Sequence, residues 1–400
     1  MLRVWRTPGR SCPGRRRRAL KPVGLLAVLG TILSMPPPAR AQAPPGPPVH
    51  PPPVQVLVDP RVELVSIVFR LAGHPEYNRG RIPSYVADVE ERFGSLRGHP
   101  VVELARRLRH DRGVSFDACM SLAVHLADVE SCAERVPFEP RPVDLDARWR
   151  PQEARDFTAH LRDFAKVGRF AEFFTAHRKL YDTAETRMRT LLGKDGHLEW
   201  FDQFFGERPG ARFTVALALL NGPNNYGPHC LLPDGKDDLY CILGAWARDA
   251  EGLPVFVGSE AVQTVVHEFV HSYANPFVDR HAAELKPAAE TLFAQVSEGM
   301  GRQAYGNWKT MLYESLVRAC TIRYVRRHQG QFAALVKINE EKRRQFLWAG
   351  ELSDLLGEYE SQRGRYATLE SFAPRVVAFF NAYADKHKAP AGKLPAGSRD

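Results

Sequence analysis

Apolar residues recur at three- and four-residue spacing through most of residues 84–205, which is the pattern of amphipathic helices. We expect helices over residues 101–110, 116–127, 155–166 and 170–192. The pattern changes to nearly continuous apolar runs at 212–220 and 239–247, which predict buried strands with a turn rich in Asn, Gly and Pro between them. A short strand at 254–258 and helices up to about residue 385 follow, whereas the pattern does not separate strand from helix at 54–58 and 63–70.

This order of elements predicts a mainly helical α+β fold, with a small sheet packed beside the helix that begins near Ser259. We divide the chain into a mainly helical N-terminal lobe at 54–205 and a second region at 206–385. Residues 42–60 are rich in proline and predict an extended tether, and residues 386–400 predict a disordered tail.

The N-terminus has the composition of a cleavable export signal. Basic residues at 15–18 and 21 precede an apolar run at 23–35, which is too short for a typical membrane span. Ala39, Arg40 and Ala41 form an A-x-A site, so we expect cleavage after residue 41, and the RRRALK run also approximates a twin-arginine signal. The alternative is an uncleaved N-terminal anchor.

Removal of this segment changes the charge of the protein. Of the 55 Lys and Arg residues, nine lie in residues 1–41, which leaves 46 against 46 Asp and Glu in the mature chain. The high pI of the full sequence is therefore no argument for nucleic-acid binding.

Five cysteines remain after cleavage, and an odd number in an exported protein suggests disulfides and one spare thiol. The simplest expectation is that Cys119 pairs with Cys132 and Cys230 with Cys241, while Cys320 is a buried free thiol. The chain has no C-x-x-C motif, which argues against a cysteine-based zinc site.

The run HEFVHS lies within a predicted helix and contains two histidines four residues apart. His267 and His271 therefore share one side of the helix, where both imidazoles can bind one zinc ion at about 2.0–2.1 Å. Glu268 can take a proton from a water on that ion, whose pKa the metal lowers to about 7. Ser259 is the expected N-cap, and Pro276 is expected to end the helix. The alternative is a buried helix whose histidines are satisfied by hydrogen bonds.

A catalytic zinc usually has three protein ligands and one open position, so a further ligand is expected. The downstream candidates are Asp279, His281, Glu284, Glu290, Glu298 and Glu314. We favour Glu314, because residues 308–326 form a long predicted helix on which this carboxylate has few acidic neighbours. The alternative for Glu314 is a surface ion pair with Arg318 at i, i+4, and Glu298 is the next candidate ligand.

Three segments of the chain resemble a bacterial family known only as a domain of unknown function. They are HEFVHSYANP at 267–276, YESLVRA at 313–319 and RVELVSI at 61–67, and the resemblance spans roughly residues 54–385. It implies a zincin-like metallopeptidase with a glutamate ligand, whose catalytic core is at 206–385. The roles it implies are zinc binding by His267, His271 and Glu314, proton transfer by Glu268, and support of the ligands by Asn275 and Arg318.

A sheet followed directly by the metal-binding helix fits the zincin plan, in which an edge strand beside the cleft pairs with an extended substrate. We expect residues 239–247 to be that strand and the loop 224–227 to border the cleft, with a plain turn as the alternative for the loop. Tyr305 and Tyr313 are candidates for a hydroxyl that stabilises a developing oxyanion, with core packing as the alternative for each.

These features predict an exported zinc-dependent metallohydrolase, and first of all a peptidase acting on a peptide or protein, with one zinc ion per chain. One alternative is a zinc amidohydrolase that acts on cell-wall material. Another is a non-catalytic binding or scaffold protein with a remnant zinc site, although the intact Glu268 argues against it. We expect no nucleic-acid partner and no membrane span in the mature chain. The sequence leaves the substrate and the oligomeric state open.

Overall fold

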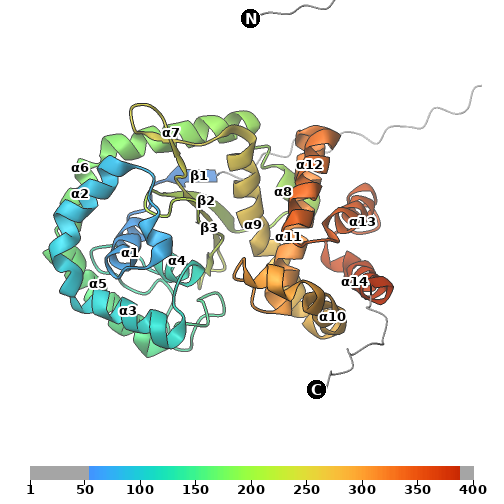
Figure 1. Ribbon diagram of the computed structural model, residues 1–400, viewed down its shortest axis with the longest axis horizontal. Coiled ribbons are helices and arrows are strands. Elements are labelled where there is room, and N and C mark those ends of the chain that lie inside the picture. Colours follow the sequence, from blue (N-terminus) through green and yellow to red (C-terminus); the bar gives the residue numbers. More distant parts are fainter. Residues whose placement is uncertain (1–53, 388–400) are drawn as a thin grey trace, which may run out of the picture. The chain divides into compact units, whose positions relative to one another are not determined.

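The computed structural model describes residues 54–387, and helices account for most of them (Figure 1). The first helices are α1 (Pro60–Leu71), α2 (Pro83–Phe93), α3 (Pro100–Arg112), α4 (Asp117–Val124), α5 (Pro151–Val167), α6 (Phe170–Ala176), α7 (Arg178–Asp195) and α8 (Trp200–Phe205). The later helices are α9 (Gly258–Arg280), α10 (Ala282–Gly301), α11 (Trp308–His328), α12 (Gly330–Arg343), α13 (Ala349–Ser361) and α14 (Ala373–His387). The strands are β1 (Val54–Leu57), β2 (Ala211–Ala218), β3 (Asn225–Tyr226), β4 (His229–Leu231), β5 (Asp237–Gly244), β6 (Ala247–Arg248) and β7 (Pro254–Val255).

The main sheet is mixed and has the order β1-β2-β5-β3, with β4 also paired to β5. Both β1 and β5 run parallel to β2, so that Val215 lies between Val56 and Cys241. The short strands β3 and β4 pair antiparallel with opposite ends of β5, and β6 and β7 form a separate pair. The prediction that 239–247 forms the edge strand is therefore wrong, because the chain after β2 folds back along β5 and covers that edge.

Different helices cover the two faces of the main sheet, since side chains alternate between faces along a strand. On one face, Phe269 of α9 packs edge-to-face on Phe213 of β2, with the ring centroids 5.0 Å apart. On the other face, Arg61 of α1 donates a hydrogen bond to the hydroxyl of Tyr240 in β5. The helices α2, α3, α5, α6 and α7 surround α1 and α4, and α10 to α14 lie beyond α9 (Figure 1). The predicted mainly helical α+β fold, with its small sheet beside the histidine-bearing helix, is confirmed.

Helix boundaries follow local chemistry in most places. Helices α1, α2, α3 and α5 each begin at a proline, which suits a first turn because its missing N–H would have no partner there. The single helix predicted over 170–192 is two helices, because the chain breaks at His177 between α6 and α7. The predicted N-cap Ser259 lies inside α9, which is capped by Val257 without a side-chain hydrogen bond.

Helix α9 continues through Pro276 to Arg280, so the prediction that this proline ends the helix is wrong. A proline inside a helix leaves the carbonyl four residues earlier without its N–H donor. Here that carbonyl belongs to Ser272, and the Nη1 atom of Arg208 donates to it at 3.0 Å. A side chain from outside the helix thus replaces the lost hydrogen bond.

The five cysteines of the described residues are all free and buried, so the predicted disulfides are absent. Cys230 lies opposite Asp238 in the β4–β5 pair, which leaves it three positions out of register with Cys241. Three strand residues span about 10 Å, and a disulfide needs Cα atoms less than about 7 Å apart. Cys132 donates instead to the carbonyl of Val129, and Cys320 is a buried free thiol as predicted.

The predicted N-terminal lobe and second region share the main sheet, because β1 pairs with β2 across the boundary at 205–206. The last residues of the predicted tether belong to β1 and α1, and α14 extends to His387 into the predicted tail. The predicted signal peptide at 1–41, the rest of the tether and residues 388–400 lie outside the described residues. None of the described helices is long and apolar enough to cross a membrane.

Candidate metal centre

Helix α9 places His267 and His271 on one side and anchors them through its opposite side. Val262, Val265, Val266 and Phe269 recur at helical spacing and are fully buried. This apolar side packs on the sheet and on α8, where Phe201 contacts Phe269. The histidine side is less enclosed, because 19% of the His267 side chain and 15% of the His271 side chain remain exposed. Both imidazoles are therefore held by a packed helix and are still reachable from solvent.

Helix α11 packs against α9 and brings Glu314 to the two histidines (Figure 1). One carboxylate oxygen lies 3.5 Å from the Nε2 atom of His267, and the other lies 3.5 Å from Nε2 of His271. One potential ligand atom from each of the three residues lies within 4.8 Å of the others. Two ligands of a tetrahedral zinc ion at about 2.0–2.1 Å are about 3.3 Å apart, so the separations suit a shared metal ion.

The orientation of His271 is fixed by its other ring nitrogen. Its Nδ1 atom lies 3.1 Å from the side-chain oxygen of Asn275, one turn further along α9. Nδ1 therefore donates the hydrogen bond and Nε2 presents its lone pair to the cluster, as a metal-binding histidine requires. Burial holds the pKa of His267 well below its usual range, and the neighbouring His271 adds to this effect. A neutral imidazole is the form that binds a metal.

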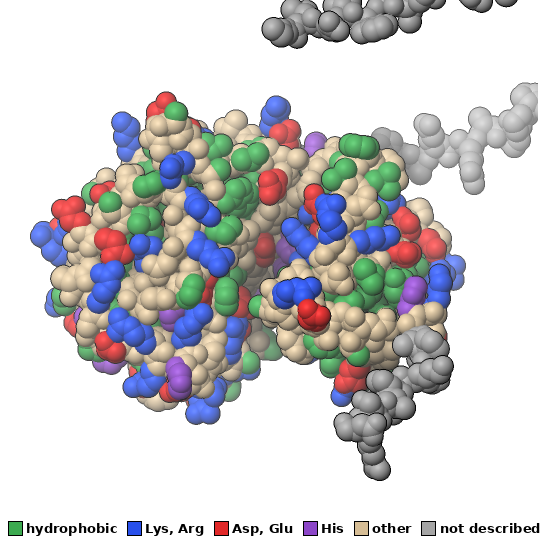
Figure 2. Space-filling view, viewed as in Figure 1, with side chains coloured by type: hydrophobic (Ala, Val, Ile, Leu, Met, Phe, Trp, Pro, Cys, Tyr) green, Lys and Arg blue, Asp and Glu red, His purple; other side chains and the backbone are tan. Residues whose placement is uncertain are grey.

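Glu268 lies beside this cluster but is not part of the ligand group. Its side chain is nearly buried, and burial, followed by the charge of Glu314, raises its pKa to about 8. A carboxyl group with so high a pKa exchanges its proton near neutral pH, which is the range in which a general base works well. Figure 2 shows acidic and histidine side chains at the floor of a furrow in the surface.

Arg318 connects the cluster to helix α12. Its guanidinium lies 2.8 Å from Glu314, 2.5 Å from Glu341 and 3.1 Å from the hydroxyl of Tyr305, and only 5% of the residue is exposed. Glu314 and Arg318 do form an ion pair, but it belongs to a buried network and is not the surface pair considered as the alternative. Burial would raise the pKa of Glu341, but Arg318 and Lys337 hold it below its usual value. Glu341 was not predicted, because nothing in the charged run around it marks one glutamate over its neighbours.

The remaining predicted residues lie outside the cluster. The hydroxyl of Tyr313 donates to Asp279, which also pairs with Lys309, so this tyrosine points away from Glu314, its neighbour in the chain. The other candidate ligands are also paired elsewhere: His281 with Glu370 and Glu284, Glu290 with Lys286, and Glu298 with Arg302. Of the two tyrosines, only Tyr305 contacts the network that holds Glu314.

The segment containing β3 and β4 lies directly against α9. A Cβ atom on Gly227 would lie 2.4 Å from the carbonyl oxygen of Glu268, so only glycine permits this approach. The adjacent Tyr226 is nearly buried, and its hydroxyl has no hydrogen-bond partner among the described residues. Burial raises the pKa of Tyr226 well above its usual value, and nearby acidic groups that include Glu268 add to this effect. The predicted loop 224–227 therefore borders Glu268, partly as a strand rather than as a plain turn.

A cavity of about 690 Å³ lies on the opposite face of the sheet and contains none of these residues. Its charged lining includes the ion pairs Arg61–Asp59 and Arg135–Asp238. Because Asp238 and Tyr240 point away from the face that carries α9, the sheet separates this cavity from the metal cluster.

The fold and the cluster define an α+β protein with a candidate metal centre between two packed helices. The chain belongs to the family described as Domain of unknown function (DUF4932), whose profile matches residues 54–379. No curated protein and no solved structure matches the chain.

Proposed function

We propose that this protein is a zinc-dependent metallohydrolase, and specifically a peptidase with Glu268 as its general base. The observation that carries the proposal is the convergence of His267, His271 and Glu314 beside a buried glutamate. Two imidazoles and one carboxylate are the donor set of several catalytic zinc sites, which leave one position open. The partial exposure of both histidines provides access to that position.

Zinc fits these residues better than calcium or magnesium. Imidazole nitrogen suits zinc, whereas calcium and magnesium prefer sites made of oxygen atoms. When bound, the ion would supply a Lewis acid and lower the pKa of a coordinated water to about 7. Its positive charge would also oppose the repulsion from Glu314, so that Glu268 loses its proton more readily.

Residues around the centre would transfer the proton, hold the ligands in position and stabilise developing charge. Glu268 accepts the proton of the attacking water and delivers it to the leaving amine. Arg318 holds the Glu314 carboxylate in place and donates a hydrogen bond to the Tyr305 hydroxyl. This hydroxyl is the candidate donor for charge that develops on the substrate. Asn275 fixes the ring of His271. Each task needs a side chain that packing or hydrogen bonds already orient.

The edge strands favour an extended peptide as the substrate over other amides. Among the described residues β3 pairs with no strand other than β5, whereas on the outer side of β4 the backbone N–H of Leu231 already donates to Asp144. The segment that joins them touches the backbone of Glu268. A peptide added along this edge would run past the general base, as in β-strand addition.

The test is cleavage of an unspecific peptide mixture by the purified protein, with metal content measured in parallel. We expect hydrolysis that a chelator abolishes and added zinc restores. Cleavage that is insensitive to the chelator would contradict the proposal. Zinc binding without cleavage of any peptide would favour an amidohydrolase acting on cell-wall material or a non-catalytic role.

We also propose that the protein acts outside the cytoplasm, on the basis of its N-terminal sequence alone. Mass spectrometry of protein recovered from the cell envelope or medium should show a chain that begins at Gln42. An intact chain that begins at Met1 and stays in the cytosol would contradict export.

A further inference from the structure

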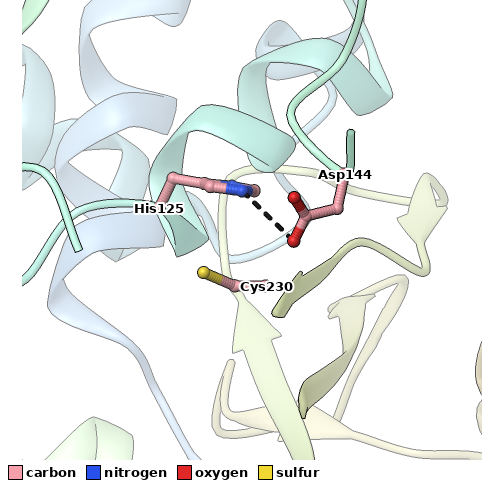
Figure 3. Close-up of side chains that lie close together, drawn as sticks. All are labelled: His125, Asp144 and Cys230. Atoms are coloured by element: carbon pink, nitrogen blue, oxygen red, sulfur yellow. Dashed lines mark ion pairs between the residues drawn. The ribbon is translucent and has the colours of Figure 1, made fainter. Parts of the chain in front are cut away.

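A second group of potential metal ligands consists of His125, Asp144 and Cys230, and it shares no residue with the centre on α9 and α11. His125 caps the C-terminus of α4, Asp144 lies in the connection between α4 and α5, and Cys230 lies in β4. The three side chains point into the same small volume (Figure 3). One potential ligand atom of each lies within 4.8 Å of the others. Only the fold brings these segments together.

The ring of His125 is oriented as in a metal-binding histidine. Its Nδ1 atom lies 2.8 Å from the backbone carbonyl of Ser121. A carbonyl can only accept, so Nδ1 carries a proton, and Nε2 is the ring nitrogen that faces Asp144 and Cys230. Metal-binding histidines usually donate their second nitrogen to a carbonyl or carboxylate in this way.

One buried atom of the cluster, Nε2 of His125, lacks a hydrogen bond among the described residues. Its contact with Oδ2 of Asp144 is a long ion pair of 3.5 Å (Figure 3). Buried polar atoms almost always have a partner, so this atom requires an explanation. The separation is the same as the two nitrogen-to-oxygen distances in the α9–α11 centre and suits two ligands of one zinc ion.

Asp144 is also held in position. Its Oδ2 atom accepts a hydrogen bond of 2.5 Å from the backbone N–H of Leu231, the residue after Cys230. All three side chains are almost completely buried. A thiolate and a carboxylate together neutralise one divalent cation, so a bound ion would leave no net charge in this interior.

We propose that His125, Asp144 and Cys230 form a second, structural metal site for a zinc-type divalent cation. Sulfur, nitrogen and oxygen in one set suit zinc, because thiolate is a poor ligand for calcium or magnesium. Burial closes the site to substrates, so its role is to hold the fold. The absence of a C-x-x-C motif does not exclude this site, since only one of the ligands is a cysteine.

A metal ion at this site would stabilise the connection between α4 and α5, which has little regular secondary structure. The connection between α4 and α5 covers residues 125–150 and contains one isolated bridge, between Leu126 and Glu134. Connections longer than about 12–15 residues without secondary structure are uncommon unless something orders them. A metal ion would link this connection to β4, and thereby to the strip of chain that touches Glu268.

Cobalt substitution tests the site on the intact, purified chain. Cobalt bound by a thiolate gives a charge-transfer band in the near ultraviolet, whereas the α9–α11 centre has no sulfur ligand and cannot give one. We expect this band and about two metal ions per chain in the wild type. The double variant His267→Ala/His271→Ala should retain the band with about one ion. This double variant leaves His125, Asp144 and Cys230 unchanged. It therefore tests the buried site even if the Cys230→Ser substitution prevents folding.

Two single variants identify the thiol. Cys230→Ser should lose the band and one metal ion, and Cys320→Ser, which removes another buried thiol, should keep both. A wild-type cobalt spectrum without the band would overturn the proposal and indicate a buried imidazolium–carboxylate pair instead. Persistence of the band in Cys230→Ser would also overturn it. Neither result depends on hydrolytic activity, so the proposed peptidase function could fail while this site stands.

Discussion

The α9–α11 centre and the His125 cluster contain related ligands in opposite surroundings. In the first, the side chains of His267, His271 and Glu314 are 19%, 15% and 10% exposed, and in the second those of His125 and Asp144 are 0% and 2% exposed. The first lies on two long packed helices, whereas the second joins a helix end, an irregular connection and a short strand.

The difference teaches how one fold can use similar side chains for two purposes. A site that performs hydrolysis needs solvent access, an open ligand position and a base, and the α9–α11 centre has Glu268 beside it. A site that only holds chain segments together needs none of these and gains from complete burial. Solvent access and the adjacent Glu268, rather than the ligands alone, distinguish the α9–α11 centre from the His125 cluster.

The largest expected effect is on catalysis at the exposed centre. Glu268→Gln removes the base but none of the ligands, so kcat should fall by about 10²- to 10⁴-fold while the zinc content stays unchanged. Peptide cleavage and metal analysis on one preparation measure both quantities. Glu260→Gln, on the exposed first turn of the same helix, should be neutral. Wild-type activity in Glu268→Gln would remove the proposed mechanism.

A second effect concerns the ligand set of the same centre. Glu314→Ala leaves the metal with two histidines, so zinc affinity should fall by more than the roughly 10- to 100-fold that loss of an outer partner costs. Competition with a chelator measures this affinity. Glu298→Ala and Glu290→Ala are matched controls, because Glu290 pairs with Lys286 on α10 and Glu298 pairs with Arg302 directly after it. If Glu314→Ala holds zinc as tightly as the wild type, the assignment of the third ligand is wrong.

The buried cluster should affect stability instead of turnover. In the His267→Ala/His271→Ala background only the buried site remains, so added zinc at about 100 times its Kd should raise the free energy of unfolding by about 2.7 kcal/mol. Denaturant unfolding with and without zinc measures this change. A further Cys230→Ser substitution should abolish the response to zinc. An unfolding curve of the double variant that does not respond to zinc would contradict a structural site.

The smallest expected effect tests support of Glu314 from α12. Glu341→Gln removes the second carboxylate that holds Arg318, so zinc affinity at the exposed centre should fall about 10- to 100-fold. Chelator competition on this variant and on Glu340→Gln, whose side chain is 41% exposed, provides a matched comparison. Equal losses in both variants would mean that charge near α12, and not the buried network, determines affinity.

The sequence predicted the parts of the molecule that depend on local pattern. Helical spacing identified α9 and α11, and the apolar runs identified β2 and β5, because each pattern covers enough residues to be distinctive. The HExxH spacing placed both histidines on one helix side without any knowledge of the fold. Glu314 was selected because it has few acidic neighbours on its predicted helix and because the YESLVRA segment resembles the family pattern.

The parts that depend on distant segments could not be read from local pattern. The order of the strands depends on how residues 225–231 fold back along β5, and the continuation of α9 depends on Arg208, far from Pro276 in the chain. Tyr313 was one of two candidate hydroxyls, but it directly precedes Glu314 on the helix, and consecutive residues on a helix point in different directions, so Tyr313 contacts Asp279 instead of the cluster. The His125 cluster has no motif, since its members are spread along the chain from 125 to 230.

The central claim is that His267, His271 and Glu314 bind a zinc ion next to Glu268. A crystal structure of the zinc-loaded protein, with anomalous diffraction measured on both sides of the zinc absorption edge, tests it most directly. We predict an anomalous peak between these three side chains, at about 2.0–2.2 Å from each ligand atom, and another at the His125 cluster. A zinc-saturated crystal without a peak between His267, His271 and Glu314 would contradict the account.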